Sequence, residues 1–337
     1  MSLTQSVLEG NRLALARLLT QVENNSPEGR IALAELFPYT GQSHLIGVTG
    51  APGTGKSSLV NQLALHYRKS DDKKVAIVAV DPSSPFTGGA VLGDRVRMRD
   101  LSGDSGVFIR SMASRGSLGG IAQATAAIAQ VFDAARYEII IIETVGAGQS
   151  EVDIARLAHT TLVVEAPGFG DDIQAIKAGI LEIADVLVIN KADRPGVENT
   201  ERALRTTLEL AHPTTRVFRH HGQAMTVQGT VIDPNMWIPP INKTVATEGK
   251  GITELSESIA KHAEHLRQSG DWAARDRARL GSEMEALLQE TLMARFFDNI
   301  QQEQYEEVIE RVINRNLSPY EAVKFLLNGR VPGKENS

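Results

Sequence analysis

The segment Gly50–Ser57, GAPGTGKS, constrains the fold of this chain more than any other stretch. Its spacing, G-x-x-x-x-G-K-[ST], is the pattern of a phosphate-binding loop that joins a buried strand to a helix. The flanking residues fit both elements, because an apolar run over His44–Thr49 precedes the loop and a helical pattern over Ser57–Arg68 follows it. The sequence therefore predicts a strand–loop–helix unit built around a bound phosphate.

Short apolar runs alternate with longer helical stretches through the middle of the chain. The predicted strands are His44–Thr49, Val75–Val80, Val107–Arg110, Ile139–Ile142, Thr161–Glu165 and Val186–Ile189. The predicted helices between them include Ser57–Arg68, Gly120–Ala135, Asp172–Ile183 and Glu198–Ala211. Continuously apolar strands that alternate with helices are typical of a parallel sheet covered on both faces. We therefore predict an α/β fold with a doubly wound, mostly parallel sheet in a P-loop domain over residues 41–255.

Helical extensions are predicted on both sides of this domain. The N-terminal extension, 1–40, contains a helix that ends at Asn24–Pro27 and a short second helix from about Pro27 to Leu36. The C-terminal extension, 256–330, contains a long helix over Trp272–Asp298. One side of that helix is apolar and carries Leu280, Met284, Leu287, Leu288, Leu292, Phe296 and Phe297. This stripe must pack either on its own domain or on a second copy of the chain. The polar residues 331–337 are predicted to be disordered.

The composition limits the classes of partner. The net charge of −6 does not favour nucleic-acid binding, which needs a basic surface. The chain has no cysteine, so it has no disulfide, thiolate metal site or cysteine nucleophile. Charged residues interrupt the first twenty positions, and no apolar run approaches the roughly 18 residues of a membrane span. We therefore expect a cytoplasmic protein that binds neither nucleic acid nor a membrane.

Each residue type in Gly50–Ser57 suits contact with phosphate. Glycines let the loop turn its N–H groups around a β-phosphate, and the following helix adds the positive end of its dipole. Lys56 can neutralise the β- and γ-phosphates, and the Ser57 hydroxyl can ligate Mg²⁺. The expected phosphate-binding residues are Gly50, Ala51, Pro52, Gly53, Thr54, Gly55, Lys56, Ser57, Ser58 and, from a later loop, Gly146.

Three carboxylates are candidates for the metal side of the site. Glu143 follows four isoleucines in YEIIIIETVGAGQS, at the end of a predicted strand. In P-loop proteins a carboxylate there faces Mg²⁺, directly or through water. Asp81 and Asp94 flank the segment 82–93, which could order around Mg²⁺ and the γ-phosphate, although Asp81 could instead cap a turn. The expected metal-binding residues are Ser57, Asp81, Asp94 and Glu143, and the expected catalytic residues are Lys56, Asp81 and Glu143.

The base is predicted from Asn190-Lys-Ala-Asp193, an N-K-x-D pattern that follows a buried strand. The Asp193 carboxylate can accept hydrogen bonds from guanine N1–H and N2–H₂, whereas adenine offers it an unprotonated N1. Asn190 would hold the loop, and the stem of Lys191 would cover the ring. In the loop Thr244–Gly251, the Ala246 N–H is expected to meet guanine O6. The expected guanine-binding residues are Asn190, Lys191, Asp193 and Ala246.

Six segments in this order, GAPGTGKSS, VDPSSPFTGGAVLGDRVRM, FIRSMASRG, ETVGAGQSE, GDDIQAIKAGI and NKAD, resemble the MeaB/ArgK-type GTPases, a metallochaperone-like group of P-loop GTPases. The resemblance covers nearly the whole chain. It implies GTP/GDP and Mg²⁺ as ligands, a homodimer formed through a C-terminal helical arm, and a chaperone role. In that role, GTP hydrolysis gates cofactor loading of an adenosylcobalamin-dependent acyl-CoA mutase, typically methylmalonyl-CoA mutase, and protects it.

The resemblance also assigns a mobile segment, Gly170–Lys177, that couples the nucleotide site to the mutase. Its polar members are Asp171, Gln174 and Lys177. From the residues alone this segment is a helix N-terminus with capping aspartates. Glu165 departs from the family, which is more apolar at this position. No glutamine stands directly beside Gly146 to orient a water, so we predict slow intrinsic hydrolysis that a partner stimulates.

Two other functions remain open. A metal-insertion GTPase of the same wider group would need a site that stores the metal, usually built from cysteines and histidines. This chain has no cysteine, and its candidate ligands are the adjacent pair His220 and His221. A P-loop kinase of an amino-acid transport system would transfer phosphate to an acceptor other than water. Asp193 argues against ATP as its substrate.

Overall fold

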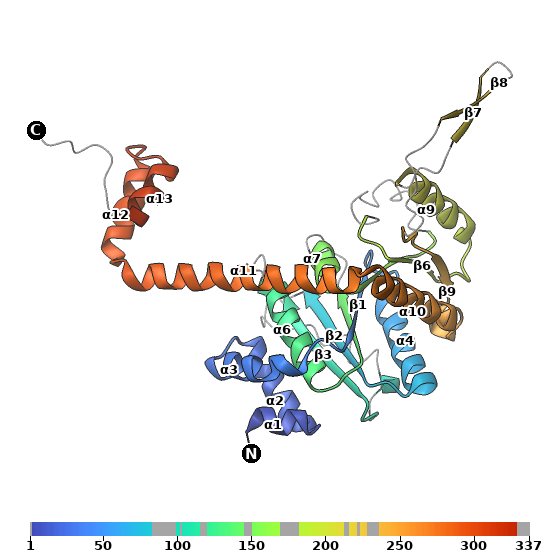
Figure 1. Ribbon diagram of the computed structural model, residues 1–337, viewed down its shortest axis with the longest axis horizontal. Coiled ribbons are helices and arrows are strands. Elements are labelled where there is room, and N and C mark those ends of the chain that lie inside the picture. The colour runs from blue at the N-terminus through green and yellow to red at the C-terminus, as the bar shows by residue number, and fades with distance from the viewer. Residues whose placement is uncertain are drawn as a thin grey trace, which may run out of the picture. The chain divides into compact units, whose positions relative to one another are not determined.

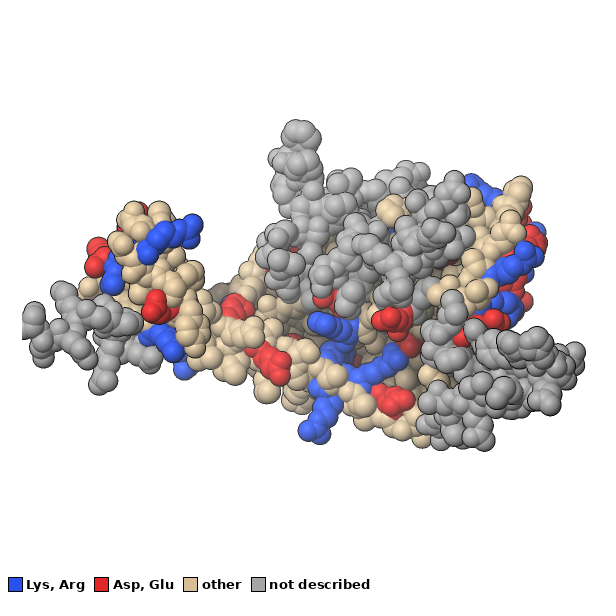
Figure 2. Space-filling model, turned by 90° about the horizontal axis from the view of Figure 1, so that it is seen from above, with Lys and Arg blue, Asp and Glu red and all other residues tan. Residues whose placement is uncertain are grey.

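The computed structural model describes residues 2–82, 99–101, 103–114, 120–144, 150–168, 182–211, 216–220, 223–227 and 236–328 (Figure 1). The chain divides into two compact units, Met1–Arg279 and Leu280–Ser337. The candidate catalytic residues predicted above all belong to the first unit. On the face shown in Figure 2, the described basic and acidic side chains are interspersed.

A parallel sheet forms the centre of the first unit. Among the described residues it has seven strands, in the order β3-β2-β4-β1-β5-β6-β9. The strands are β1 His44–Thr49, β2 Val75–Pro82, β3 Val107–Ser114, β4 Ile139–Thr144, β5 Thr160–Glu165, β6 Val186–Asn190 and β9 Ile241–Thr244. All pairings within this sheet are parallel. The six predicted strands and the parallel α/β fold are confirmed, whereas β9 was not predicted because INKT is short and has a single apolar residue.

Helices cover both faces of the sheet, which confirms the doubly wound arrangement (Figure 1). On one face, α4 Lys56–Asp71 and α10 Ile252–Ser269 bury apolar side chains against Ile139 and Ile141. On the other, α6 Gly120–Ala134 and α7 Ser150–Leu157 pack on Ile140 and Ile142. Successive residues of β4 therefore enter opposite cores, as the alternation of side chains along a strand requires. A further helix, α9 Val197–Ala211, packs on β6.

The N-terminal helices add a fourth layer outside α6. They are α1 Leu3–Leu8, α2 Arg12–Glu23 and α3 Pro27–Leu36. Leu18 and Leu19 of α2 are fully buried in the same core as Phe132 of α6. The predicted break before Pro27 is confirmed, but the single helix expected before it is wrong. Gly10 adopts a left-handed φ of +84°, and the Asn11 side chain then caps α2 by accepting the Ala14 N–H.

Two further features differ from the sequence prediction. An antiparallel hairpin, β7 Arg216–His220 and β8 Gln223–Val227, was not expected. The helix predicted over Asp172–Ile183 falls largely outside the described residues.

The second unit is helical. It contains the end of α11 Asp271–Asn299, together with α12 Gln302–Ile313 and α13 Pro319–Asn328. Val308, Leu317 and Ala322 form its small core. α11 confirms the long helix predicted over Trp272–Asp298.

The apolar stripe of α11 is exposed: Met284, Leu288 and Leu292 are each more than half accessible. In the part of the chain that the structure describes, α11 contains no buried residue.

Candidate nucleotide-binding site

The phosphate-binding loop lies between the carboxyl end of β1 and the first turn of α4, as predicted. Two of its glycines are required by their surroundings. Gly50 has φ +137°, and a Cβ there would lie 2.1 Å from the Val164 carbonyl oxygen of β5. Gly55 has φ +93°, and a Cβ there would lie 2.4 Å from Nδ2 of Asn190. The loop therefore fits closely between two neighbouring strands, and any side chain at these positions would displace it.

Lys56 is the first residue of α4 and is buried, with 6% of its surface exposed. Its ammonium nitrogen donates to the carbonyl oxygens of Gly50, at 2.8 Å, and Ala51, at 3.1 Å. The Thr54 hydroxyl donates to the same Ala51 oxygen over 3.0 Å. These bonds hold the positive charge inside the curve of the loop, beside the positive end of the α4 dipole. Anions are favoured at such a place.

The Ser57 hydroxyl donates a hydrogen bond of 2.7 Å to Oε1 of Glu143. Ser57 lies in the first turn of α4, and Glu143 lies near the end of β4, paired in register with Val48 of β1. Glu143 is 6% exposed. A serine hydroxyl that donates its proton keeps lone pairs as acceptors, so the same oxygen can also ligate a cation. Hydroxyl and carboxylate oxygens are the hard ligands that Mg²⁺ prefers, so these two residues fit that ion.

Asp81 belongs to the same edge of the sheet. It is the next-to-last residue of β2, which pairs with β4 so that Ala79 faces Glu143. The side chain of Asp81 lies outside the described part of the structure. Several other predicted residues lie wholly outside it, namely Asp94, Gly146, Asp171, Gln174 and Lys177.

Asn190, the last residue of β6, connects three segments. Its Nδ2 donates to the Thr54 carbonyl oxygen over 2.8 Å. Its Oδ1 accepts from the Thr244 hydroxyl and from the Ala246 N–H, each over 3.1 Å. Asn190 is 2% exposed, so this amide is a buried junction between the phosphate loop and the segment that follows β9.

The two charged residues after Asn190 lie at the surface of the same region. Lys191 has a left-handed φ of +57°, and its ammonium donates to the Gly53 carbonyl over 2.6 Å. Asp193 is exposed. Glu248, paired with Lys250 over 2.6 Å, raises the pKa of Lys250, and the charge of Asp193 adds to this effect. Asp193 therefore lies within electrostatic range of the loop Thr244–Gly251.

Thr244 is a site residue that the sequence prediction missed. Its contact with Asn190 depends on β9, and INKT carries no strand pattern strong enough to place it beside β6.

Glu165 is buried at the end of β5, in the strand next to β1. The structure therefore places one more carboxylate at the carboxyl edge of the sheet.

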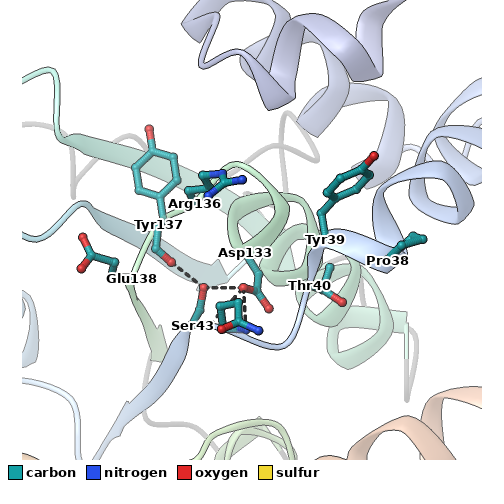
Figure 3. A pocket seen from close by; sticks show the side chains of 9 residues that line it. Pro38, Tyr39, Thr40, Ser43, Asp133, Arg136, Tyr137 and Glu138 are labelled. Atoms are coloured by element: carbon teal, nitrogen blue, oxygen red, sulfur yellow. Dashed lines mark hydrogen bonds between the residues drawn. The ribbon is translucent and has the colours of Figure 1, made fainter.

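A polar pocket of about 410 Å³ lies at the opposite, amino edge of the sheet. Its lining residues are Pro38, Tyr39, Thr40, Gln42, Ser43, Asp133, Arg136, Tyr137 and Glu138. Figure 3 shows Asp133 and Ser43 joined at its centre. Asp133 accepts the N–H groups of Gly41, Gln42 and Ser43, which closes the turn before β1. This pocket precedes β1 and β4, so it is separate from the phosphate loop.

Two features are absent from the described residues. No group of three or more histidine, aspartate or glutamate side chains among them is arranged to hold a metal ion. None of the helices in the described ranges is both long and apolar enough to cross a membrane.

Comparison with known proteins gives a consistent result. The protein-family model described as "Methylmalonyl Co-A mutase-associated GTPase MeaB" matches residues 15–301. A relative from Pyrococcus abyssi is 42% identical over 331 residues, which cover 98% of this chain and 97% of that protein. The GTPase ArgK of Escherichia coli is 36% identical over 78% of this chain and 75% of its own length.

Two further matches extend this comparison. The mitochondrial methylmalonic aciduria type A homolog of Caenorhabditis elegans is 30% identical over 80% of this chain and 67% of its own length. A crystal structure described as a LAO/AO transport system kinase superposes with a TM-score of 0.69 at 26% identity, covering 97% of this chain and 96% of that one. Together with the strand–loop–helix geometry at Gly50–Ser57, these matches show that the chain belongs to the MeaB/ArgK family of P-loop GTPases.

Proposed function

We propose that this protein binds and hydrolyses GTP, and that hydrolysis gates cofactor loading of an adenosylcobalamin-dependent methylmalonyl-CoA mutase and protects that enzyme. The observation that carries the GTPase part is the 2.7 Å contact between Ser57 and Glu143, which sets two hard oxygen ligands beside the phosphate loop. The mutase part is supported by the description of the matching family and by the name of the C. elegans relative.

The phosphates would be held by residues 50–58 and Gly146. Backbone N–H groups would surround the β-phosphate, and the Lys56 ammonium would move from the loop carbonyls to the β- and γ-phosphates. Ser57, Asp81, Asp94 and Glu143 would hold Mg²⁺, which supplies positive charge against the leaving phosphate. Lys56, Asp81 and Glu143 are therefore the residues that we assign to catalysis.

Guanine would be read by the loop that Asn190 anchors. Because Asn190 is fixed to both Thr54 and Ala246, the position of Asp193 is set relative to the phosphate loop. The Asp193 carboxylate would accept guanine N1–H and N2–H₂, and the stem of Lys191 would cover the ring. The Ala246 segment would line the O6 side of the base.

Regulation would come from outside the nucleotide site. Asp171, Gln174 and Lys177 would couple the site to the mutase, which would stimulate a slow intrinsic reaction. The exposed apolar stripe of α11 supports a homodimer in which a second copy covers it. In this proposal, residues 1–40 are a helical extension, 41–255 the GTPase domain, 256–330 the dimerisation arm and 331–337 a disordered tail.

A direct test measures phosphate release from GTP by the purified chain, with and without purified methylmalonyl-CoA mutase. We expect slow Mg²⁺-dependent hydrolysis that the mutase accelerates, and its loss in Lys56→Ala. Hydrolysis that the mutase does not change would remove the chaperone part and leave the GTPase part standing.

The description of the superposed crystal structure as a kinase makes one further assay useful. Labelled γ-phosphate should appear only as inorganic phosphate. Its appearance on a protein or a small molecule would favour the kinase alternative.

A further inference from the structure

We propose that Thr49 and Thr144 are positioning residues of the nucleotide site, whose paired hydroxyls fix Glu143 relative to the start of the phosphate loop. The Thr144 hydroxyl donates to the Thr49 hydroxyl over 3.1 Å. Thr49 is 0% exposed and Thr144 is 3% exposed, so both hydroxyls lie in the protein interior. This inference rests on the GTPase function proposed above.

The two threonines occupy equivalent places at the carboxyl edge of the sheet. The parallel register of β1 and β4 pairs Val48 with Glu143. Thr49 and Thr144 are one position further along and end their strands. Gly50 follows Thr49 and begins the phosphate loop, and Glu143 directly precedes Thr144. The hydroxyl contact therefore joins the residue before the phosphate loop to the residue after Glu143.

The threonine pair lies on the face of the sheet opposite to the contact between Ser57 and Glu143. Side chains alternate along a strand, and Val48 packs in the core beneath α4 while Glu143 reaches Ser57 of α4. Thr49 and Thr144 therefore point to the opposite face, where Ile140 and Ile142 pack on α6. Ser57 bonds to Glu143 on the α4 face, so the threonine pair would act on the metal side of the site through the backbone of β4.

A hydroxyl pair at this place is not explained by packing. Valine has nearly the same shape as threonine, and a buried hydroxyl is costly unless it is hydrogen-bonded. Threonine adds a directional hydrogen bond between the ends of β1 and β4, one position after the last backbone pair, Val48 and Glu143. The 2.7 Å contact between Ser57 and Glu143 depends on that register, because a small shift of β4 along β1 would lengthen it.

The test compares Thr144→Val, which keeps the shape and removes the donor, with Thr144→Ser, which keeps the donor. We expect Thr144→Val to raise both the KM for GTP and the Mg²⁺ concentration for half-maximal hydrolysis by about fivefold. GDP affinity measured without Mg²⁺ should change less than about twofold, because Glu143 is assigned to Mg²⁺ and not to the phosphates. Thr144→Ser should restore values near those of the wild type.

Thr161→Val is the matched control. Thr161 lies on β5 beside β1, is 1% exposed, and its hydroxyl has no hydrogen-bond partner in the described structure. This variant should leave the GTP and Mg²⁺ parameters unchanged. Equal losses for GDP and GTP in Thr144→Val, or unchanged GTP and Mg²⁺ parameters, would overturn the proposal.

A double-mutant cycle separates this pair from a general loss of packing. If the two hydroxyls act through each other, the double variant Thr49→Val/Thr144→Val should show the same KM for GTP and the same Mg²⁺ requirement as either single variant. Additive effects of the two substitutions would contradict the proposal. A wild-type protein without GTPase activity would instead refute the proposed function, so the two failures are distinguishable.

Discussion

Arg275 and Asp185 form a two-point ion pair in the first unit: Nη1 and Nη2 of the guanidinium each donate over 2.8 Å to one carboxylate oxygen. Asp185 directly precedes β6, and Arg275 lies in the first turns of α11. Burial alone would raise the pKa of Asp185, but hydrogen bonds from Arg275 and His262 outweigh it and lower the pKa to about 2. The pair therefore attaches the beginning of α11 to the sheet.

Arg275→Ala should lower the free energy of unfolding by about 2–3 kcal/mol, because it leaves the buried Asp185 charge without its main partner. Urea unfolding at pH 7 measures this. Arg277→Ala removes an exposed arginine from the same turn and should have almost no effect. Equal losses in the two variants would show that the ion pair is unimportant.

Stability should fall as the pH drops below about 6.5, because of two buried histidines. Burial lowers the pKa of His44 well below its ordinary value, and burial also lowers that of His159. Nδ1 of His159 accepts the Leu45 N–H, which requires an unprotonated nitrogen. Below this pH the unfolded chain therefore binds more protons than the folded chain. The free energy of unfolding falls by up to about 1.4 kcal/mol per pH unit for each histidine.

Urea unfolding between pH 5 and 8 tests this sign. His159→Asn keeps an acceptor near the Leu45 N–H but cannot take a proton, so its stability should depend less on pH than that of the wild type. A wild-type stability that is constant over this range would contradict the prediction.

Gly55→Ala should weaken binding of a fluorescent GTP analogue by at least about tenfold. Its Cβ would collide with the Asn190 amide, and φ of +93° strains any residue with a side chain. Gly10→Ala introduces a similar strain at φ +84° with nothing within 4 Å, far along the chain from the loop. That variant should lose some stability and bind GTP normally. Normal binding by Gly55→Ala would show that the Asn190 contact is dispensable.

Asp193→Asn should change the preferred base from guanine towards xanthine. An amide can donate to the xanthine O2, whereas it meets the guanine N2–H₂ with a second donor, so we expect GTP affinity to fall by about 100-fold or more. Competition binding with GTP, xanthosine triphosphate and ATP measures the shift. Unchanged guanine selectivity would remove Asp193 from the base site.

Leu288→Glu should convert the proposed dimer into a monomer while GTP binding stays normal. Leu288 is 55% exposed on α11, and a buried unpaired carboxylate in an interface is costly. Size-exclusion chromatography with light scattering gives the mass. Gln289→Glu adds the same charge at the neighbouring exposed position and should remain dimeric. A monomeric wild type would refute the dimer.

Local features of the sequence determined much of the site. The phosphate loop, the strand before it and the helix after it were predicted because each depends on neighbouring residues: glycines at set spacing, an apolar run and a helical period. The run of four isoleucines placed Glu143 near the end of a strand for the same reason. The six predicted strands also implied a parallel sheet, since strands buried on both faces need helices on each side.

Only the tertiary structure decided which strands are neighbours. The order β2-β4-β1-β5-β6 sets Glu143 beside Ser57, 86 positions apart in the chain, and sets Asn190 against Thr54. Likewise, the partner of β9 and the contact between Thr49 and Thr144 depend on strand register, and the exposure of the α11 stripe depends on what packs there. The sequence pattern reports the local backbone and the burial of a residue, whereas these contacts depend on how distant segments pack together.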